Sequence, residues 1–488
     1  MQKFYAGTLK PYVPTSQRPW NEQRIGHLYR RLTYGETTAN QKNALRRNPQ
    51  HIVDHIVGNA ANKRPTPAPS WHNTYKSQYQ NRGMNYDDEN RKNRHQWFTQ
   101  TVKDQSEDGL HGIMTLFWHN HFVTRLDEYV SSTYMYHYYN TLQKYAMGDF
   151  RVLVKKIGLT FAMLRYLNGF SNRKDRPNEN YARELFELFT LGENRGYTQK
   201  DITETARALT GYNKGKSNDP LHFDPKMFDD SEKIIFGRKG NWNYDQVIDI
   251  LFEERGKYVA EFIVGKIYKH FVNPKINVPI VRELARDFAK DFKIAPILRK
   301  LFKSEHFFDE SNIGVMIKSP YDLSMNLIKT LNIRLTDQRM GALYWIARRQ
   351  GQAFFNPVDV AGWQGDWDWI STSTLNARWQ QTVTILWFAT GANEAYRIGN
   401  MDKLRKFAKN VSNNSTDPDY VTRRIVDTLI PRGFYSKEDY VTAADVFRMR
   451  YPENHYTSGI WNLNIKGAPE QVRDLLQYLF KHPEFQTK

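Results

Sequence analysis

Apolar residues recur three and four positions apart along most of this 488-residue chain, which is the spacing that places them on one face of an α-helix. This pattern predicts an all-α fold, and we expect one large multi-helix domain over residues 1–488 with long irregular loops. A short β-hairpin is expected near residues 233–236. The predicted helices cover residues 22–32, 38–48, 50–59, 95–105, 110–122, 131–147, 149–157, 160–167, 179–191, 198–211, 244–252, 258–271, 278–288, 294–303, 321–331, 375–390, 401–410, 418–429, 443–451 and 469–481.

Residues 59–94 interrupt the helical pattern. Lys63–Pro69 contains three prolines within five residues and is typical of a polyproline-like tract. Residues 75–94 are rich in Asn, Gln and charged side chains, with few aliphatic ones. We therefore expect a surface insertion or flexible arm, either a plain linker or a basic segment that binds a partner.

The charge balance bears on the class of partner. Lys and Arg number 70 against 52 for Asp and Glu, a formal net charge of +18, so acidic glycans, nucleic acid and anionic surfaces are all admissible partners. A generally basic, solvated surface explains the same numbers, because the cations are spread along the chain. The absence of cysteine excludes disulfides, thiolate metal sites and cysteine nucleophiles.

The sequence also bears on location. The first residues contain no apolar run of the length found in signal peptides, so we expect either a cytoplasmic protein or a processed form of an envelope or exported one. No apolar run approaches the roughly 18 residues of a membrane span.

The segment Pro177–Gly192 concentrates polar groups around one short helix. Glu184 and Glu187 lie three apart at the border of an apolar stripe. Carboxylates at such a border must be paired, hydrated or metal-bound, because burying an unpaired charge is costly. We regard both as candidate catalytic groups and metal ligands. The same segment supplies three candidate substrate-binding residues, Asn178, Asn180 and Arg183.

The sequence Trp118–His121 contains two histidines two positions apart. On a continuing helix they point about 160° away from each other, so they can share a metal only if the helix ends there. His119 and His121 are candidate acids or bases, and His119 is a candidate metal ligand. The alternative is a pair of hydrogen-bonded core histidines.

The next predicted helix adds Glu204, a candidate metal ligand, and Arg207, a candidate substrate-binding residue. Its Thr198-x-x-Asp201 start is typical of a capping box. A short loop separates it from the preceding helix, so the two should be antiparallel neighbours. One interpretation is a salt-bridge network in which arginines neutralise the glutamates. The other is a carboxylate and histidine cluster that holds Mn, Fe, Zn or Mg.

Residues 362–369 combine turn glycines with three tryptophans and two acids. Aromatic faces beside carboxylates are suited to sugars, through stacking and hydrogen bonds. A structural loop that seals the helical core is the equal alternative. The candidate substrate-binding residues here are Trp363, Asp366, Trp367, Trp369 and Arg378, the last also a candidate partner of Asp366 or Asp368.

Several separated motifs carry a resemblance to a known family. They are Phe117–Phe122, Pro177–Gly192, Ala208–Tyr212 and Pro357–Trp363, with an opening at His27–Gly35 and a close at His482–Gln486. In this order they resemble the bacterial family catalogued as domain of unknown function 1800. The resemblance covers nearly the whole chain. It implies that Asp229 stands where the family usually has a histidine, and so could replace it as a metal ligand.

Two functions remain open from the sequence. The first is an enzyme whose histidine and carboxylate site acts on a glycan or related polymer. The second is a non-catalytic binding or assembly protein in which the same residues only stabilise the fold. The family resemblance also implies a sulfatase-like protein, encoded nearby, as a partner, or a shared sulfated or phosphorylated substrate. No common phosphate-binding, serine-hydrolase, zinc-protease or kinase motif is present.

Overall fold

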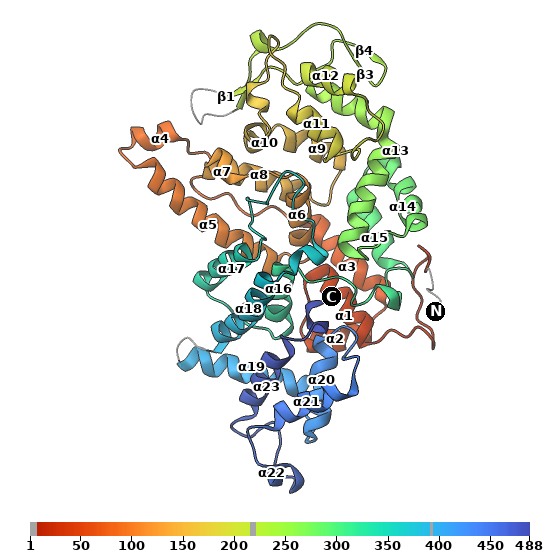
Figure 1. Ribbon diagram of the computed structural model, residues 1–488, viewed down its shortest axis with the longest axis vertical. Helices are drawn as coiled ribbons and strands as arrows, with labels where there is room; N and C mark the ends of the chain where they lie inside the picture. The colour runs from red at the N-terminus through yellow and green to blue at the C-terminus, as the bar shows by residue number, and fades with distance from the viewer. Residues whose placement is uncertain (1–6, 215–220, 391–393) are drawn as a thin grey trace.

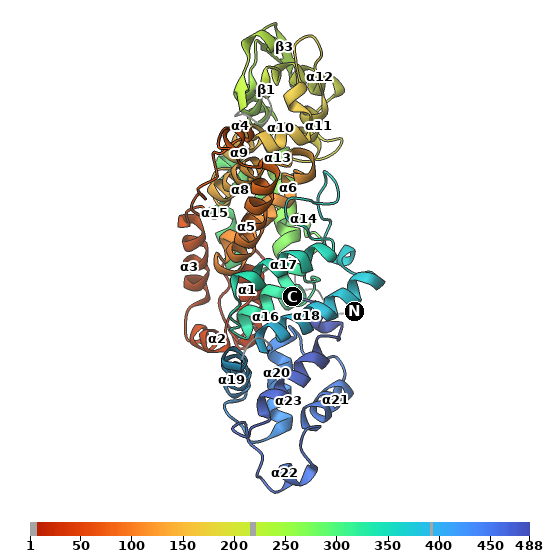
Figure 2. The same cartoon turned by 90° about the vertical axis from the view of Figure 1, so that its left-hand side faces the viewer.

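The computed structural model describes residues 7–214, 221–390 and 394–488, and it shows an elongated, all-α molecule (Figure 1). The chain starts near the middle, rises to one end, and returns through three green helices before it builds the opposite end (Figures 1 and 2). The buried apolar side chains form one contiguous cluster that runs from Leu9 to Phe485. None of the helices in the described ranges combines the length and apolar character of a membrane-spanning segment.

The first part of the chain forms helices joined by loops. Its helices are α1 Glu22–Thr33, α2 Thr38–Leu45, α3 Pro49–Asn62, α4 Lys76–Asn81, α5 Tyr86–Glu107, α6 Leu110–His121, α7 Leu126–Tyr129, α8 Ser132–Tyr145, α9 Phe150–Gly158 and α10 Phe161–Tyr166.

One end of the molecule holds two short helices and two small antiparallel hairpins (Figure 1). Its elements are η1 Gly169–Ser171, α11 Asn180–Glu187, α12 Gln199–Ala208, β1 Tyr212–Lys214, β2 Leu221–Phe223, η2 Pro225–Met227, β3 Lys233–Ile235 and β4 Arg238–Gly240. The hairpin predicted near residue 233 is confirmed as β3 and β4, with Ile235 opposite Arg238. The Thr198 capping box is confirmed as well, since the Thr198 and Asp201 side chains each accept from the other's backbone N–H.

The remaining helices fill the middle and the opposite end. They are α13 Tyr244–Phe271, α14 Val278–Asp291, α15 Ile294–Lys303, η3 Glu310–Asn312, α16 Pro320–Thr330, α17 Asp337–Arg349, η4 Asp366–Trp369, α18 Thr372–Thr390, α19 Glu394–Ser412, α20 Pro418–Leu429, α21 Lys437–Arg448, α22 Glu453–Thr457, α23 Ala468–Leu479 and η5 Glu484–Gln486. The two helices predicted over 244–271 are in fact one, α13, and α17 was not predicted.

Residues 59–94 lie at the surface, and part of this segment is helical. Residues 86–94 form the first turns of α5, which projects with α4 from one side of the molecule (Figure 1). The indole of Trp71 is buried and meets Trp97 edge to face at a centroid distance of 5.8 Å. The polyproline tract is thus followed by a docked aromatic anchor, whereas residues 81–85 are exposed.

Candidate functional site

A cavity of about 500 Å³ lies where segments far apart in the sequence meet. Its wall is built from the C-terminal half of α6, the C-terminal half of α13, the start of α16 and the loop over residues 361–369. The side chain of Lys488 closes one side. Because α6 and α13 supply polar side chains while the loop supplies indoles, the cavity combines charged groups with flat aromatic surfaces.

The loop over residues 361–369, called the tryptophan loop below, places two of its indoles in the cavity wall and one in solvent. Trp363 and Trp369 are only 7% and 8% exposed, line the cavity, and have ring centroids 6.5 Å apart. Trp367 is 75% exposed and does not line the cavity. Of the three predicted sugar-stacking residues, the structure therefore brings two together at one site. Asp366 lines the same cavity and accepts a hydrogen bond from the backbone N–H of Ile317 at 3.3 Å.

The loop is joined to α6 through Asn120. Its side-chain oxygen accepts from the Trp363 N–H at 2.6 Å, and its side-chain nitrogen donates to the Trp363 carbonyl at 2.9 Å. Gly362 comes just before, with φ +79° and with a virtual Cβ only 2.5 Å from the Asn120 carbonyl oxygen. Only glycine fits both the left-handed backbone and this close approach. The joint fixes Trp363 against the end of α6.

The two histidines singled out in the sequence lie in different surroundings. His119 is fully buried, accepts from the Phe355 N–H at 2.9 Å, and stacks against Trp363 at a centroid distance of 5.5 Å. Burial lowers the pKa of His119 to about 3, so the ring is neutral. His119 does not line the cavity, but it supports the indole that does. The expected divergence of the two rings on a continuing helix is what the structure shows.

His121 lines the cavity together with Lys266 of α13. The His121 Nε2–H donates to the Phe189 carbonyl at 2.9 Å, which leaves Nδ1 to accept from the Lys266 Nζ at 3.1 Å. Burial, and then the charge of Lys266, lower the pKa of His121 well below its usual value. Burial, and then the neighbouring Lys269, lower the pKa of Lys266 to about 8. The pair thus places a proton that is mobile near neutral pH inside the cavity.

The carboxylates that line the cavity already have partners. Asp322 accepts from the Lys488 ammonium with both oxygens at 2.6 Å. Burial would raise the pKa of Asp322, but Lys488 outweighs it, and the pKa lies below its usual value. Glu261 pairs with Arg195 at 2.9 Å. Asp366 is bound only to a backbone N–H, and none of these three acids forms an ion pair with Lys266 within the described residues.

Glu184 and Glu187 lie outside the cavity, on α11. Arg183 bridges Glu187 at 3.3 Å and Glu179 at 3.1 Å. Glu184 is half-buried, and its carboxylate has no hydrogen-bond partner in the described part of the chain. Burial, and then the charge of Glu187, raise the pKa of this carboxyl group. Asn178 accepts from the Asn180 N–H at 3.0 Å and so starts α11. These residues form the beginning and one face of a surface helix.

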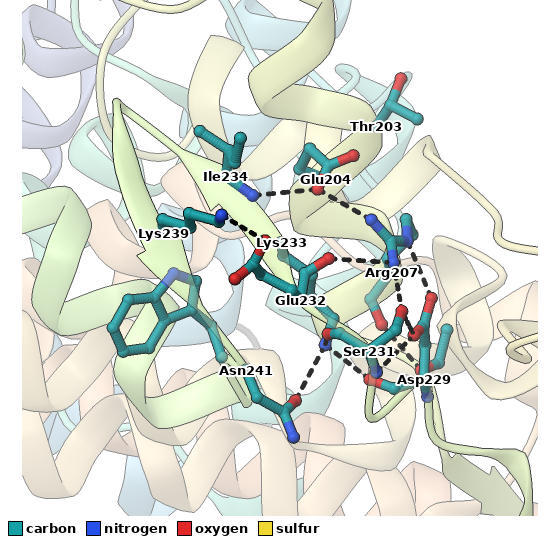
Figure 3. A network of polar contacts seen from close by, with 12 residues as sticks. Thr203, Glu204, Arg207, Asp229, Ser231, Glu232, Lys233, Ile234, Lys239 and Asn241 are labelled. Carbon is teal, nitrogen blue, oxygen red and sulfur yellow. Dashed lines mark hydrogen bonds and ion pairs between the residues drawn. The ribbon is translucent and has the colours of Figure 1, made fainter.

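Glu204 and Asp229 are bound to Arg207 (Figure 3). The guanidinium lies 2.8 Å from each carboxylate, and Glu204 also accepts from the Ile234 N–H at 3.0 Å, which attaches α12 to β3. Lys233 donates to the backbone carbonyls of Asp229 and Ser231, which completes the network. The salt-bridge interpretation describes this arrangement.

The predicted metal ligands do not converge. His119 is enclosed by aromatic rings, Glu184 and Glu187 lie on α11, and Glu204 and Asp229 hold Arg207. Within the described ranges, no group of three His, Asp or Glu side chains has the geometry of a metal site. These residues therefore do not fit a shared divalent metal.

Arg378 corrects a predicted pairing. It is fully buried and donates to the Gln486 side chain at 2.8 Å and the Lys318 carbonyl at 2.7 Å, instead of to Asp366 or Asp368. The Arg378 side chain therefore ties α18 to the segments before α16 and after α23.

Sequence reasoning missed the α13 side of the site. Lys266, Lys269 and His270 line the cavity at positions i, i+3 and i+4 of the helix. This spacing was visible in the sequence, but a basic stripe on a helix is ordinarily a solvated face. Asp322 and Lys488 are 166 residues apart, and nothing in their local sequence indicates that they meet.

Comparison with known proteins gives a match to a family and to nothing else. Neither a curated protein nor a solved structure is similar enough to match the chain. A family model described as protein of unknown function (DUF1800) matches residues 27–487. That range includes α6, α13 and the tryptophan loop. The chain therefore belongs to the DUF1800 family.

Proposed function

We propose that this protein is an enzyme that acts on a glycan or related polymer, and that its site is the cavity between α6, α13 and the tryptophan loop. Trp363 and Trp369 would stack on the sugar, and Lys266 would transfer the proton. The observation that carries the proposal is the Lys266–His121 pair, with Nζ and Nδ1 3.1 Å apart in a cavity walled by two indoles.

The chemistry follows from the two pKa values. A lysine with a pKa of about 8 is mostly protonated at neutral pH and still exchanges its proton readily, which suits general acid and base catalysis. His121 is neutral, and its Nε2–H is fixed on the Phe189 carbonyl, so it can only accept from Lys266. It therefore orients the ammonium and leaves two of its protons for the cavity. His121 is a positioning residue in this scheme.

A screen with oligosaccharides and polysaccharide digests tests the proposal, with product formation followed by mass spectrometry and binding by calorimetry. Lys266→Met keeps the aliphatic stem and removes the ammonium. We expect it to lower turnover by about a hundredfold or more, with sugar binding retained. The wild-type rate should change with pH around the Lys266 pKa of about 8, and that dependence should vanish in the variant.

The matched control is Lys257→Met on the exposed part of the same helix, which should keep full activity. Binding without turnover in the wild type would favour the non-catalytic alternative. A Lys266→Met variant with normal turnover would remove Lys266 from the mechanism.

A further inference from the structure

The α13 side of the cavity presents donors without acidic partners. Lys269 has no hydrogen bond or ion pair, and His270 has no hydrogen-bond partner, within the described residues. Lys266 has only the His121 nitrogen. Burial, and then Lys488, lower the pKa of His270 to about 3. Three polar groups on one helical face thus line the same cavity, and none of them forms an ion pair within the described residues.

Two of the three acids in the wall are neutralised by cations. Asp322 is engaged by Lys488 with both oxygens and Glu261 by Arg195, whereas Asp366 accepts from the Ile317 N–H. None of the three acids forms an ion pair with Lys266 or Lys269 in the described part of the chain, so both ammonium groups are available to an anion that enters the cavity.

The region behind the cavity is also positive. Arg30, Arg31 and Arg378 are buried, and none of them forms an ion pair within the described ranges. Arg31 and Arg378 both interact electrostatically with Asp322, which Lys488 already neutralises. The terminal nitrogens of Arg31 donate to neutral acceptors: Nη2 to the carbonyls of Val272 and Asn312, and Nη1 to the sulfur of Met316.

Buried orphan atoms point the same way. Among the residues that the structure describes, the Nε atoms of Arg30 and Arg31 and one terminal nitrogen of Arg378 have no hydrogen-bond partner. Buried cations without counterions are costly and raise the local positive potential. An anion in the adjoining cavity lowers that cost.

We propose that the cavity binds the oxyanion group of an acidic ligand, a sulfate, a phosphate ester or a carboxylate, between Lys266, Lys269 and His270. This deepens the proposed function, on which it rests, by naming the acidic substituent of the sugar. The oxyanion accepts from the two ammonium groups and from the imidazole N–H. The indoles of Trp363 and Trp369 then contact the ring that carries it.

Anion binding should be linked to proton uptake. A negative charge beside Lys266 raises the pKa of its ammonium from about 8. At pH 8 close to half of Lys266 is deprotonated in the free protein, so binding takes up about half a proton. Calorimetry in two buffers with different ionisation enthalpies measures this directly.

The experiment uses the full chain and two sets of probes. The first set is sulfate, phosphate and acetate, titrated in roughly 150 mM NaCl to screen non-specific attraction to a chain of net charge +18. The second set is sulfated, phosphorylated and uronic sugars, each beside its neutral parent. The second set identifies which oxyanion the site takes.

Lys269→Gln is the principal variant, because Lys269 is exposed and its loss does not disturb the core. Loss of one charge-assisted hydrogen bond should lower the affinity for the acidic probes about tenfold or more. His270→Gln should lower this affinity as well. Lys257→Gln, an exposed lysine on the same helix outside the cavity, should leave binding unchanged.

The proposal is overturned if Lys269→Gln and Lys257→Gln bind the acidic probes equally, or if neutral parents bind as tightly as acidic sugars. Turnover of neutral sugars with no preference for acid would remove this inference and leave the proposed function intact. Binding of acidic sugars that depends on Lys269, without turnover of any of them, would keep the inference and remove the catalytic proposal.

Discussion

The buried neutral histidines should make the protein lose stability in mild acid. The pKa of His119 and that of His270 are each lowered from 6.5 to about 3, chiefly by burial. The unfolded chain therefore binds more protons than the folded one below about pH 6.5, and stability falls as pH decreases through that range. The stability that these neutral rings contribute is fully present above the pKa of a histidine in the unfolded chain. His27 and His121, whose pKa values burial also lowers, act in the same direction.

The magnitude follows from linkage. Between pH 6.5 and 5.5 each histidine with a folded pKa of about 3 should cost about 1 kcal/mol, because the unfolded histidine is already half protonated at pH 6.5, so His119 and His270 together cost about 2 kcal/mol. Asp104 opposes them, because burial raises its pKa to about 6 and protonation then favours the folded state. Over the same interval Asp104 restores about 0.7 kcal/mol of stability. The net loss from these three groups, about 1.3 kcal/mol, is roughly a tenth to a quarter of a typical folding free energy.

Urea denaturation followed by circular dichroism at pH 7.0, 6.5, 6.0 and 5.5 measures this dependence. His119→Gln keeps an acceptor for the Phe355 N–H and removes the titrating ring, so the stability that this variant loses between pH 6.5 and 5.5 should be about 1 kcal/mol smaller than in the wild type. His51→Gln, an exposed histidine on α3, is the control. If His119→Gln keeps the full wild-type pH dependence, the assignment of His119 as a buried neutral ring is wrong.

The other predictions concern three regions. Limited proteolysis should cut first within residues 59–94, in the exposed stretch between α4 and α5; a first cut elsewhere would show that the segment is packed. Trp363→Ala should cost about 3 to 5 kcal/mol in urea denaturation, against about 0.5 kcal/mol or less for Trp367→Ala. If Trp367→Ala stays stable but is no longer retained on glycan resins, the sugar-binding surface lies outside the cavity. Glu184→Gln combined with Glu187→Gln should change stability by about 1 kcal/mol or less, since the paired Arg183 side chain is 37% exposed. A wild-type melting temperature that falls with chelator, and a variant indifferent to it, would instead identify these glutamates as metal ligands.

Local signals in the sequence predicted much of the fold. Cap and stop residues located the Thr198 start, and the bounds of α15 and α20 match their apolar periodicity. The errors have physical causes. Gly256 and its charged neighbours indicate a break in α13, but the helix continues, and Gly256 allows the Phe292 ring to approach. A predicted break is thus a place of close packing.

The start of α5 shows a second kind of error. Residues 86–94 lack apolar periodicity, yet Asn85 caps the helix by accepting from two backbone N–H groups. Salt bridges between Asp88 and Arg91 and between Glu89 and Lys92 support its first turns. Caps and charge pairs sustained a helix that hydrophobic spacing did not indicate.

The candidate site was only half predictable. The motifs with His121 and Trp363 are local and unusual, so the sequence singled them out. Lys266 is unremarkable in sequence, since its lowered pKa comes from burial against α6 and from Lys269. Glu184 shows the converse, a conspicuous residue that lies outside the cavity. Tertiary contacts, which the sequence does not display, decide both outcomes.

The joint between Asn120 and Gly362 has a consequence for how such chains diverge. Any side chain at position 362 would collide with the Asn120 backbone, and any residue other than Asn at 120 would leave the Trp363 N–H or carbonyl without its partner. Two short motifs 242 positions apart along the chain (362 − 120) therefore depend on each other's side chains and act as one structural unit. We expect relatives that have lost the asparagine to have also lost the glycine, and to have a differently shaped cavity.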